Sequence, residues 1–123
     1  MKDESLQGAS VSDLTERFLA SALAEVEAEL KSNIRKQNKC VEEQMAIAAE
    51  LKSRPGDQRS ALLVLYEHPN AQVRLNAARL TFAIAPKAAR DVIQAIRDSK
   101  RQPQAMDAGM CLYALDQGIF KPT

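Results

Sequence analysis

Apolar side chains recur every three or four residues along most of this chain. From Leu14 to Leu30 this spacing is continuous, and Ser12 precedes it with a side-chain oxygen that can cap a helix. The pattern predicts an amphipathic helix over about residues 13–30. Residues 1–11 lack any such periodicity, so we expect a flexible N-terminal tail there and a single folded domain over residues 12–123.

A second helical stripe runs from Ile34 to Leu51, with acidic residues on its polar side. Ser32 and Asn33 can cap its N-terminus. No glycine or proline separates this stripe from the first one. Two separate helices and one long bent helix therefore both remain open.

Turn and capping residues mark the next boundaries between helices. Pro55 and Gly56 end the second helix, and Asp57 is predicted to cap a short helix that reaches Tyr66. Asn70 can cap the next helix, which reaches about residue 84 and carries apolar side chains on two faces. Being apolar on two sides predicts that this helix is sandwiched between neighbours.

Two prolines open the last helices. Pro86 suits the first turn of a fifth helix, since proline there sacrifices no intrahelical hydrogen bond. Pro103 opens a sixth, which runs to about Asp116 and stops at Gly118. The pattern thus predicts an all-α fold of about six helices in antiparallel pairs, with no strand.

Composition is consistent with one small globular domain. The chain has 123 residues, 46% hydrophobic and 27% charged, with aromatic residues at 4%. The core must then consist mainly of aliphatic residues and alanine. The net charge of +1 argues against a strong general attraction to nucleic acid or to membranes. The first 56 residues hold 8 basic and 10 acidic side chains, and the remainder 9 and 6, so any basic surface belongs to the C-terminal half.

Candidates for chemistry are few. Cys40 and Cys111 are far apart and lack partners at metal-ligand spacing, so both are predicted to be buried free thiols, as in a reducing cytoplasm. His68, the only histidine, precedes a proline in a turn and is expected to be structural or solvated. Glu42 and Glu43 are adjacent on a helix and point in different directions. We therefore predict no catalytic residue, no metal site and no cofactor.

The segment ALLVLYEHPNAQVRLNAARLTFAIA, residues 61–85, resembles one HEAT repeat. Its second helix matches the pattern VRxxAAxxL, in which paired small residues allow close packing of helices. Residues 88–115 repeat this design loosely, with Asp107 and Gly109 departing from the pattern, as in a terminal repeat. The segments RPGDQR, EHPNAQVRLNAA and PQAMDAGMCLYALDQG resemble a family of short bacterial HEAT-like proteins known only as a domain of unknown function. This resemblance implies a HEAT-like α-α superhelix and brings no activity with it.

The predicted function is non-catalytic protein–protein interaction, in an adaptor or an immunity or antitoxin-like role, because helical repeats present an extended binding surface without special residues. The partner is expected to be a protein or peptide, with no role for a membrane. Self-association through the last helix is a second expectation, since its apolar residues lie at an uncovered end. The residues predicted to bind a partner are Arg74, Arg79, Arg97, Met106, Met110 and Tyr113.

Two other functional classes are compatible with parts of the sequence. A strip of basic residues in the C-terminal half could contact phosphates, which makes nucleic-acid binding the alternative. The strip would consist of Arg59, Arg74, Arg79, Arg90, Arg97, Lys100 and Arg101. Asp107 was expected to form a structural ion pair with Arg74 or Arg79 if it is buried. An enzyme is the least supported class, because no phosphate loop, nucleophile elbow or zinc motif is present.

Overall fold

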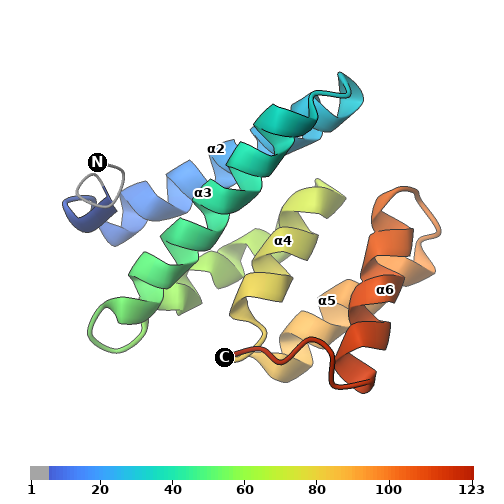
Figure 1. Cartoon of the computed structure of the whole chain (residues 1–123). Helices are drawn as coiled ribbons and strands as arrows, with labels where there is room; N and C mark the ends of the chain where they lie inside the picture. The colour runs from blue at the N-terminus through green and yellow to red at the C-terminus, as the bar shows by residue number, and fades with distance from the viewer. Residues whose placement is uncertain (1–5) are drawn as a thin grey trace. The chain divides into compact units, whose positions relative to one another are not determined.

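The computed structural model describes residues 6–123, and every regular element in that part of the chain is a helix (Figure 1). The elements are α2 (Val11–Leu30), α3 (Ile34–Ser53), the 3₁₀-helix η1 (Gln58–Glu67), α4 (Ala71–Thr81), α5 (Pro86–Asp98) and α6 (Gln104–Asp116). The predicted all-α class with six helices is confirmed for these residues. Two compact units divide the chain, Met1–Leu62 and Leu63–Thr123.

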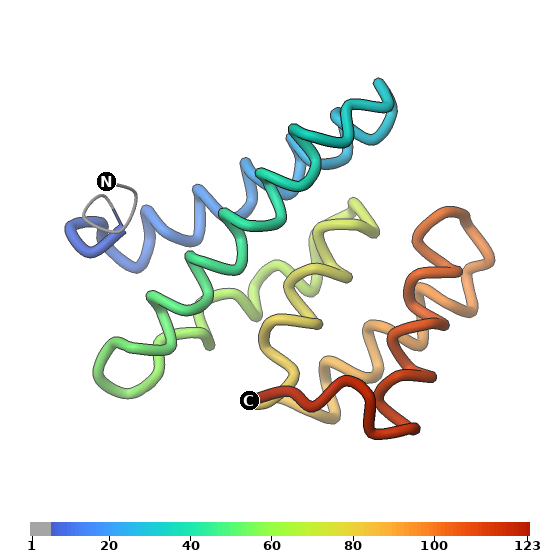
Figure 2. Tube along the Cα trace, viewed as in Figure 1, coloured from blue at the N-terminus to red at the C-terminus, as the bar shows by residue number. Residues whose placement is uncertain are grey.

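The first unit is built on an antiparallel hairpin of α2 and α3. Figure 2 shows the chain turning back between them through residues 31–33. Ser32 takes a left-handed conformation, with φ 54°, and the Asn33 side chain accepts a hydrogen bond from the backbone N–H of Lys36 at 3.1 Å. Two separate helices therefore form without glycine or proline, because a left-handed serine and an asparagine cap end one and begin the other.

The start of α2 lies earlier in the chain than predicted. Ser10, rather than Ser12, is the N-cap, and its hydroxyl accepts from the backbone N–H of Asp13 at 3.0 Å. Leu6 is buried, and its carbonyl accepts a hydrogen bond from the Arg54 guanidinium at 2.9 Å. Within the predicted tail, residues 6–11 thus include a buried side chain and the N-cap of α2. Residues 1–5 lie outside the described residues.

Helix α3 buries only part of the apolar stripe predicted for it, which comprised Ile34, Val41, Met45, Ala48 and Leu51. Its buried side chains are Cys40, Gln44, Ile47, Ala48 and Leu51. Ile34, Val41 and Met45 are instead exposed, at 67%, 38% and 56%. The apolar spacing was compatible with either face of α3, and the packing partner selected the face that carries Gln44.

The turn after α3 combines two left-handed residues, Gly56 with φ 80° and Asp57 with φ 50°. The Asp57 carboxylate accepts from the backbone N–H of Arg59 at 3.3 Å and from its guanidinium at 2.7 and 2.9 Å. The predicted helix after Asp57 is present, but it is the 3₁₀-helix η1 rather than an α-helix.

The second unit packs α5 against both α4 and α6. Asn70 caps α4, as predicted, by accepting from the backbone N–H groups of Gln72 and Val73 at 2.9 and 3.2 Å. The core is aliphatic and rich in alanine, and comprises Leu75, Ala78, Ala89, Ile93, Ile96, Ala108 and Leu112. Val73, Leu75, Ala77 and Ala78 are all fully buried, so α4 is covered on two faces as predicted.

Within residues 6–123, the helices are too short or too polar for any of them to cross a membrane.

Candidate functional site

The arrangement of side chains offers little support for metal binding or for acid–base catalysis. Among the described residues, no three His, Cys, Asp or Glu side chains gather closely enough to hold a metal ion. His68 accepts a hydrogen bond at Nδ1 from the backbone N–H of Asn70 at 3.0 Å. This contact places the histidine in the structural role predicted for it, at the turn before α4.

The predicted basic strip is largely engaged in local contacts. The Arg74 guanidinium donates to the carbonyl oxygens of His68 and Pro69 at 2.8 and 2.9 Å, which ties the turn to α4. Arg97 pairs with Asp98 at 3.0 Å. Such contacts occupy donors that phosphate binding would need.

Two more members of the strip also have acidic partners. Arg90 pairs with Asp116 at 2.9 Å, and Arg59 pairs with Asp57 at 2.7 Å. Arg79 differs from them, because it is exposed and forms no ion pair or side-chain hydrogen bond within the described part of the chain. Lys100 and Arg101 are likewise exposed and form no ion pair within residues 6–123. Of these three residues, Arg79 lines a pocket together with residues of α6.

The outer side of α6 carries a stripe of large exposed side chains. Met106, Met110 and Tyr113 are 62%, 64% and 64% exposed. Their spacing of four and then three residues places them on one side of the helix, together with Gly109. We call these four residues the α6 face. The structure thus brings together three of the six residues predicted to bind a partner.

A pocket of about 250 Å³ adjoins the α6 face and shares Met110 with it. Its lining residues come from α4, α6 and the segment after α6, and they are Arg79, Asp107, Met110, Cys111, Ala114 and Phe120. Asp107 is exposed, so the buried ion pair expected for it is absent. Its carboxylate, like the Arg79 guanidinium, has no ion-pair partner within residues 6–123.

The Cys111 thiol lies in this pocket and is half-buried rather than buried as predicted. Burial raises the pKa of the Cys111 thiol, and the positive charges of Arg79 and Arg90 only partly oppose that effect. A raised pKa keeps the thiol protonated at neutral pH, which disfavours nucleophilic catalysis. Cys40 is a buried free thiol, as predicted.

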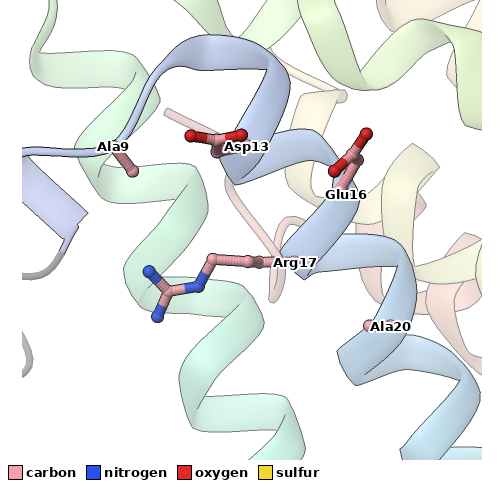
Figure 3. Close-up of a pocket in the computed structure, with 5 residues that line it drawn as sticks. All are labelled: Ala9, Asp13, Glu16, Arg17 and Ala20. Atoms are coloured by element: carbon pink, nitrogen blue, oxygen red, sulfur yellow. The ribbon is translucent and has the colours of Figure 1, made fainter.

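A second pocket, of about 430 Å³, lies on the first half of α2 (Figure 3). It is lined by Ala9, Asp13, Glu16, Arg17 and Ala20. Arg17 extends away from Glu16 and pairs with Glu43 of α3 at 3.7 Å. Asp13 and Glu16, the two carboxylates that line the pocket, are both exposed.

A groove of about 650 Å³ between α2 and α3 mixes charges of both signs. Its lining includes Lys36, Lys39, Glu42 and Glu43 together with Cys40. Glu42 is exposed, and Glu43 forms the ion pair with Arg17. These contacts agree with the expectation that the two glutamates form a solvated face.

Sequence reasoning missed two features of the first unit. One is the polar cluster of Ser21, Glu25 and Gln44, which is buried between α2 and α3. The other is the tip of the hairpin, where Leu30 and Ile34 are 82% and 67% exposed. Neither has a local sequence signal, because both depend on which faces of the two helices meet.

These features define a small all-helical protein with an exposed apolar helix face. The chain belongs to the family described as Domain of unknown function (DUF2019), whose model matches residues 12–116. It is also similar to protein RPA1889 from Rhodopseudomonas palustris CGA009, known from a crystal structure. The two are 48% identical, with a TM-score of 0.92 over 96% of this chain and 98% of that chain. No curated protein matches the chain.

Proposed function

We propose that the chain is a non-catalytic protein-interaction module that binds a protein helix through the α6 face. One observation carries this proposal, namely that Met106, Met110 and Tyr113 are each more than 60% exposed on one side of α6. Clustered exposed apolar side chains mark interaction sites, and methionine and tyrosine are both enriched in interfaces. Methionine also adapts its shape to different partners.

The arrangement of charges supports a protein partner over nucleic acid. Arg74 and Arg97, two arginines predicted to contact phosphates, are held by carbonyl or carboxylate oxygens in their own unit. The α6 face itself contains no charged residue. Asp107 and Arg79 flank it in the adjoining pocket, and Arg97, paired with Asp98, lies beside Gly109. We therefore expect a protein partner, whose surface buries the apolar stripe and pairs with one charge of each sign.

The proposal includes a HEAT-like arrangement of the helices. The VRxxAAxxL segment coincides with α4, whose Ala77 and Ala78 are fully buried. In a helical-repeat stack the last helix has no following repeat to cover it, and α6 fits this position. An adaptor and an immunity or antitoxin-like protein would both use such a surface, and free thiols suit a reducing cytoplasm.

Site-specific photo-crosslinking in the native host tests this proposal. A benzophenone amino acid at position 113 is expected to form a discrete adduct with a protein, and Met106→Glu on the same chain should abolish that adduct. The matched control is position 64, because Val64 is 67% exposed and lies away from α6 in the sequence. Equal labelling from positions 113 and 64, or adducts insensitive to Met106→Glu, would show that the α6 face is not a binding surface.

A further inference from the structure

We propose that a second copy of this chain occupies the α6 face, with two α6 helices packed antiparallel about a two-fold axis near Gly109. This inference rests on the proposed function, since it names the occupant of the same surface. Three observations carry it: the spacing of the exposed residues, the glycine among them, and the charges beside them.

The α6 face has the geometry of a hole that accepts one side chain from a facing helix. Positions i, i+3, i+4 and i+7 of a helix surround such a hole in knobs-into-holes packing. In α6 these positions are Met106, Gly109, Met110 and Tyr113. The three large side chains that rim the hole are exposed, so the hole is open to a helix from outside.

Gly109 is not required by the packing of its own chain. A Cβ atom at this position would come no closer than 3.7 Å, to Cγ of Arg97, which is ordinary van der Waals contact. Glycine in a helix interior is nevertheless the least favourable residue after proline. Close approach of another helix accounts for it, because the missing side chain deepens the hole between Met106 and Met110.

The unpaired charges near the hole favour a second copy as the occupant, since Arg97, whose side chain lies nearest Gly109, is already paired with Asp98. Arg79 and Asp107 line the pocket that shares Met110, and neither has an ion-pair partner among the described residues. A two-fold axis brings the same flank of both helices together, so each arginine can face the other subunit's aspartate. A partner whose surface carried charges of only one sign would instead place a like charge against either Arg79 or Asp107.

Mixing two charge-reversed variants tests the pairing directly. Arg79→Asp and Asp107→Arg should each raise the dimer Kd of the purified full-length chain by about tenfold or more in sedimentation equilibrium. Each variant alone places like charges across the axis at both contacts. An equimolar mixture restores both opposite-charge contacts, and should recover a heterodimer close to wild-type affinity.

The mixture separates contacts between chains from contacts within one chain. If Arg79 and Asp107 attract each other inside one subunit, each variant carries its own repulsion into the mixture, and no heterodimer forms. Absence of this rescue would overturn the inference. A wild-type chain that remains monomeric up to about 1 mM would overturn it as well.

Two substitutions at Gly109 test the hole separately from the charges. Gly109→Leu should abolish the dimer by filling the hole. Gly109→Ala should weaken the dimer and raise the Tm of the monomer by about 2–6 °C at low concentration, because alanine favours the helix and has room. An unchanged dimer with leucine at position 109 would contradict the packing.

The outcomes distinguish this inference from the proposed function. A strictly monomeric chain whose position 113 cross-links to a different protein refutes the dimer and leaves the interaction module intact. A lack of any specific cross-link refutes the interaction module. A salt-sensitive dimer whose cross-linked adduct has twice the chain mass supports both.

Discussion

The two compact units of this chain bury different kinds of side chain. Between α2 and α3, the side chains of Ser21, Glu25 and Gln44 lie among leucine, isoleucine and phenylalanine. The core shared by α4, α5 and α6 consists of aliphatic residues and alanine. The second unit also buries polar side chains, Gln72, Asn76 and Thr81, but none of them is charged. Hydrogen bonds depend on direction and apolar contacts do not, so we expect the register of the hairpin to depend more strongly on polar contacts than that of the second unit.

The hydrogen bonds of the hairpin connect its two helices. Gln44 Nε2 donates to the Glu25 carboxylate at 3.0 Å, and the Ser21 hydroxyl donates to the Cys40 carbonyl at 3.0 Å. A slip of α3 by one turn would keep much of the apolar burial but break both bonds. In the second unit, Gln104 of α6 donates to the side chain of Gln72 of α4 at 3.2 Å. Alanines in its core permit close approach of the helices.

The largest expected effect is the loss of apolar volume in the hairpin. Phe18 is fully buried, and Phe18→Ala should lower the free energy of unfolding by about 3–5 kcal/mol. Urea unfolding followed by circular dichroism at 222 nm measures it. Ile119→Ala is the control, because Ile119 is 71% exposed and should change stability by less than about 0.5 kcal/mol. Similar effects from both changes would contradict the packing of α2.

A second substitution tests whether polar contacts stabilise the hairpin. Gln44→Leu keeps a similar volume but removes a donor to the buried Glu25 carboxylate, and should cost about 1–3 kcal/mol. Gln117→Leu is the matched control at an exposed position. Equal or greater stability of Gln44→Leu in urea unfolding would show that the hairpin does not depend on its buried polar contacts.

Helix caps offer a smaller comparison between the units. Asn70 accepts two backbone N–H groups and Asn33 accepts one. Asn70→Ala should therefore cost about 1–2 kcal/mol and Asn33→Ala about 0.5–1 kcal/mol. Thermal unfolding of both variants at matched concentration measures the difference. A larger loss at Asn33 than at Asn70 would reverse the order expected from the number of bonds.

The smallest expected effect is a dependence on alkaline pH in the second unit. Burial raises the pKa of the Tyr66 hydroxyl, while its hydrogen bond with Thr81 opposes this shift. The unfolded chain releases this proton at a lower pH than the folded chain does. The contribution to stability is therefore fully present below about pH 10 and is lost as the pH rises through the folded-state pKa. Tyr66→Phe should remove this part of the alkaline loss in urea midpoints between about pH 9 and 11.

Cys111 is expected to contribute to the same alkaline loss from a lower pH, because burial also raises the pKa of its thiol. Cys111→Ala separates the two groups, and the double substitution with Tyr66→Phe should leave the flattest alkaline profile. An alkaline loss in Tyr66→Phe as steep as in the wild type would assign it to other residues.

The sequence alone determined which segments are helical and where most of them end. Apolar periodicity, the stop at Pro55 and Gly56, the cap at Asn70 and the prolines at 86 and 103 are local signals, so they act before any packing partner is known. The exposed methionines and tyrosine of α6 were anticipated for a related reason. Helix α6 carries more apolar residues than its contacts with α4 and α5 cover.

The tertiary structure alone decided which face of each helix is buried and which charges remain unpaired. The spacing of α3 allowed Ile34 or Gln44 to face α2, and only packing against that helix selected Gln44. Likewise, the sequence could not show that Arg74 binds the carbonyls of its own turn while Arg79 stays available beside Asp107. Pairing depends on distances between helices, and such distances arise only when the chain has folded.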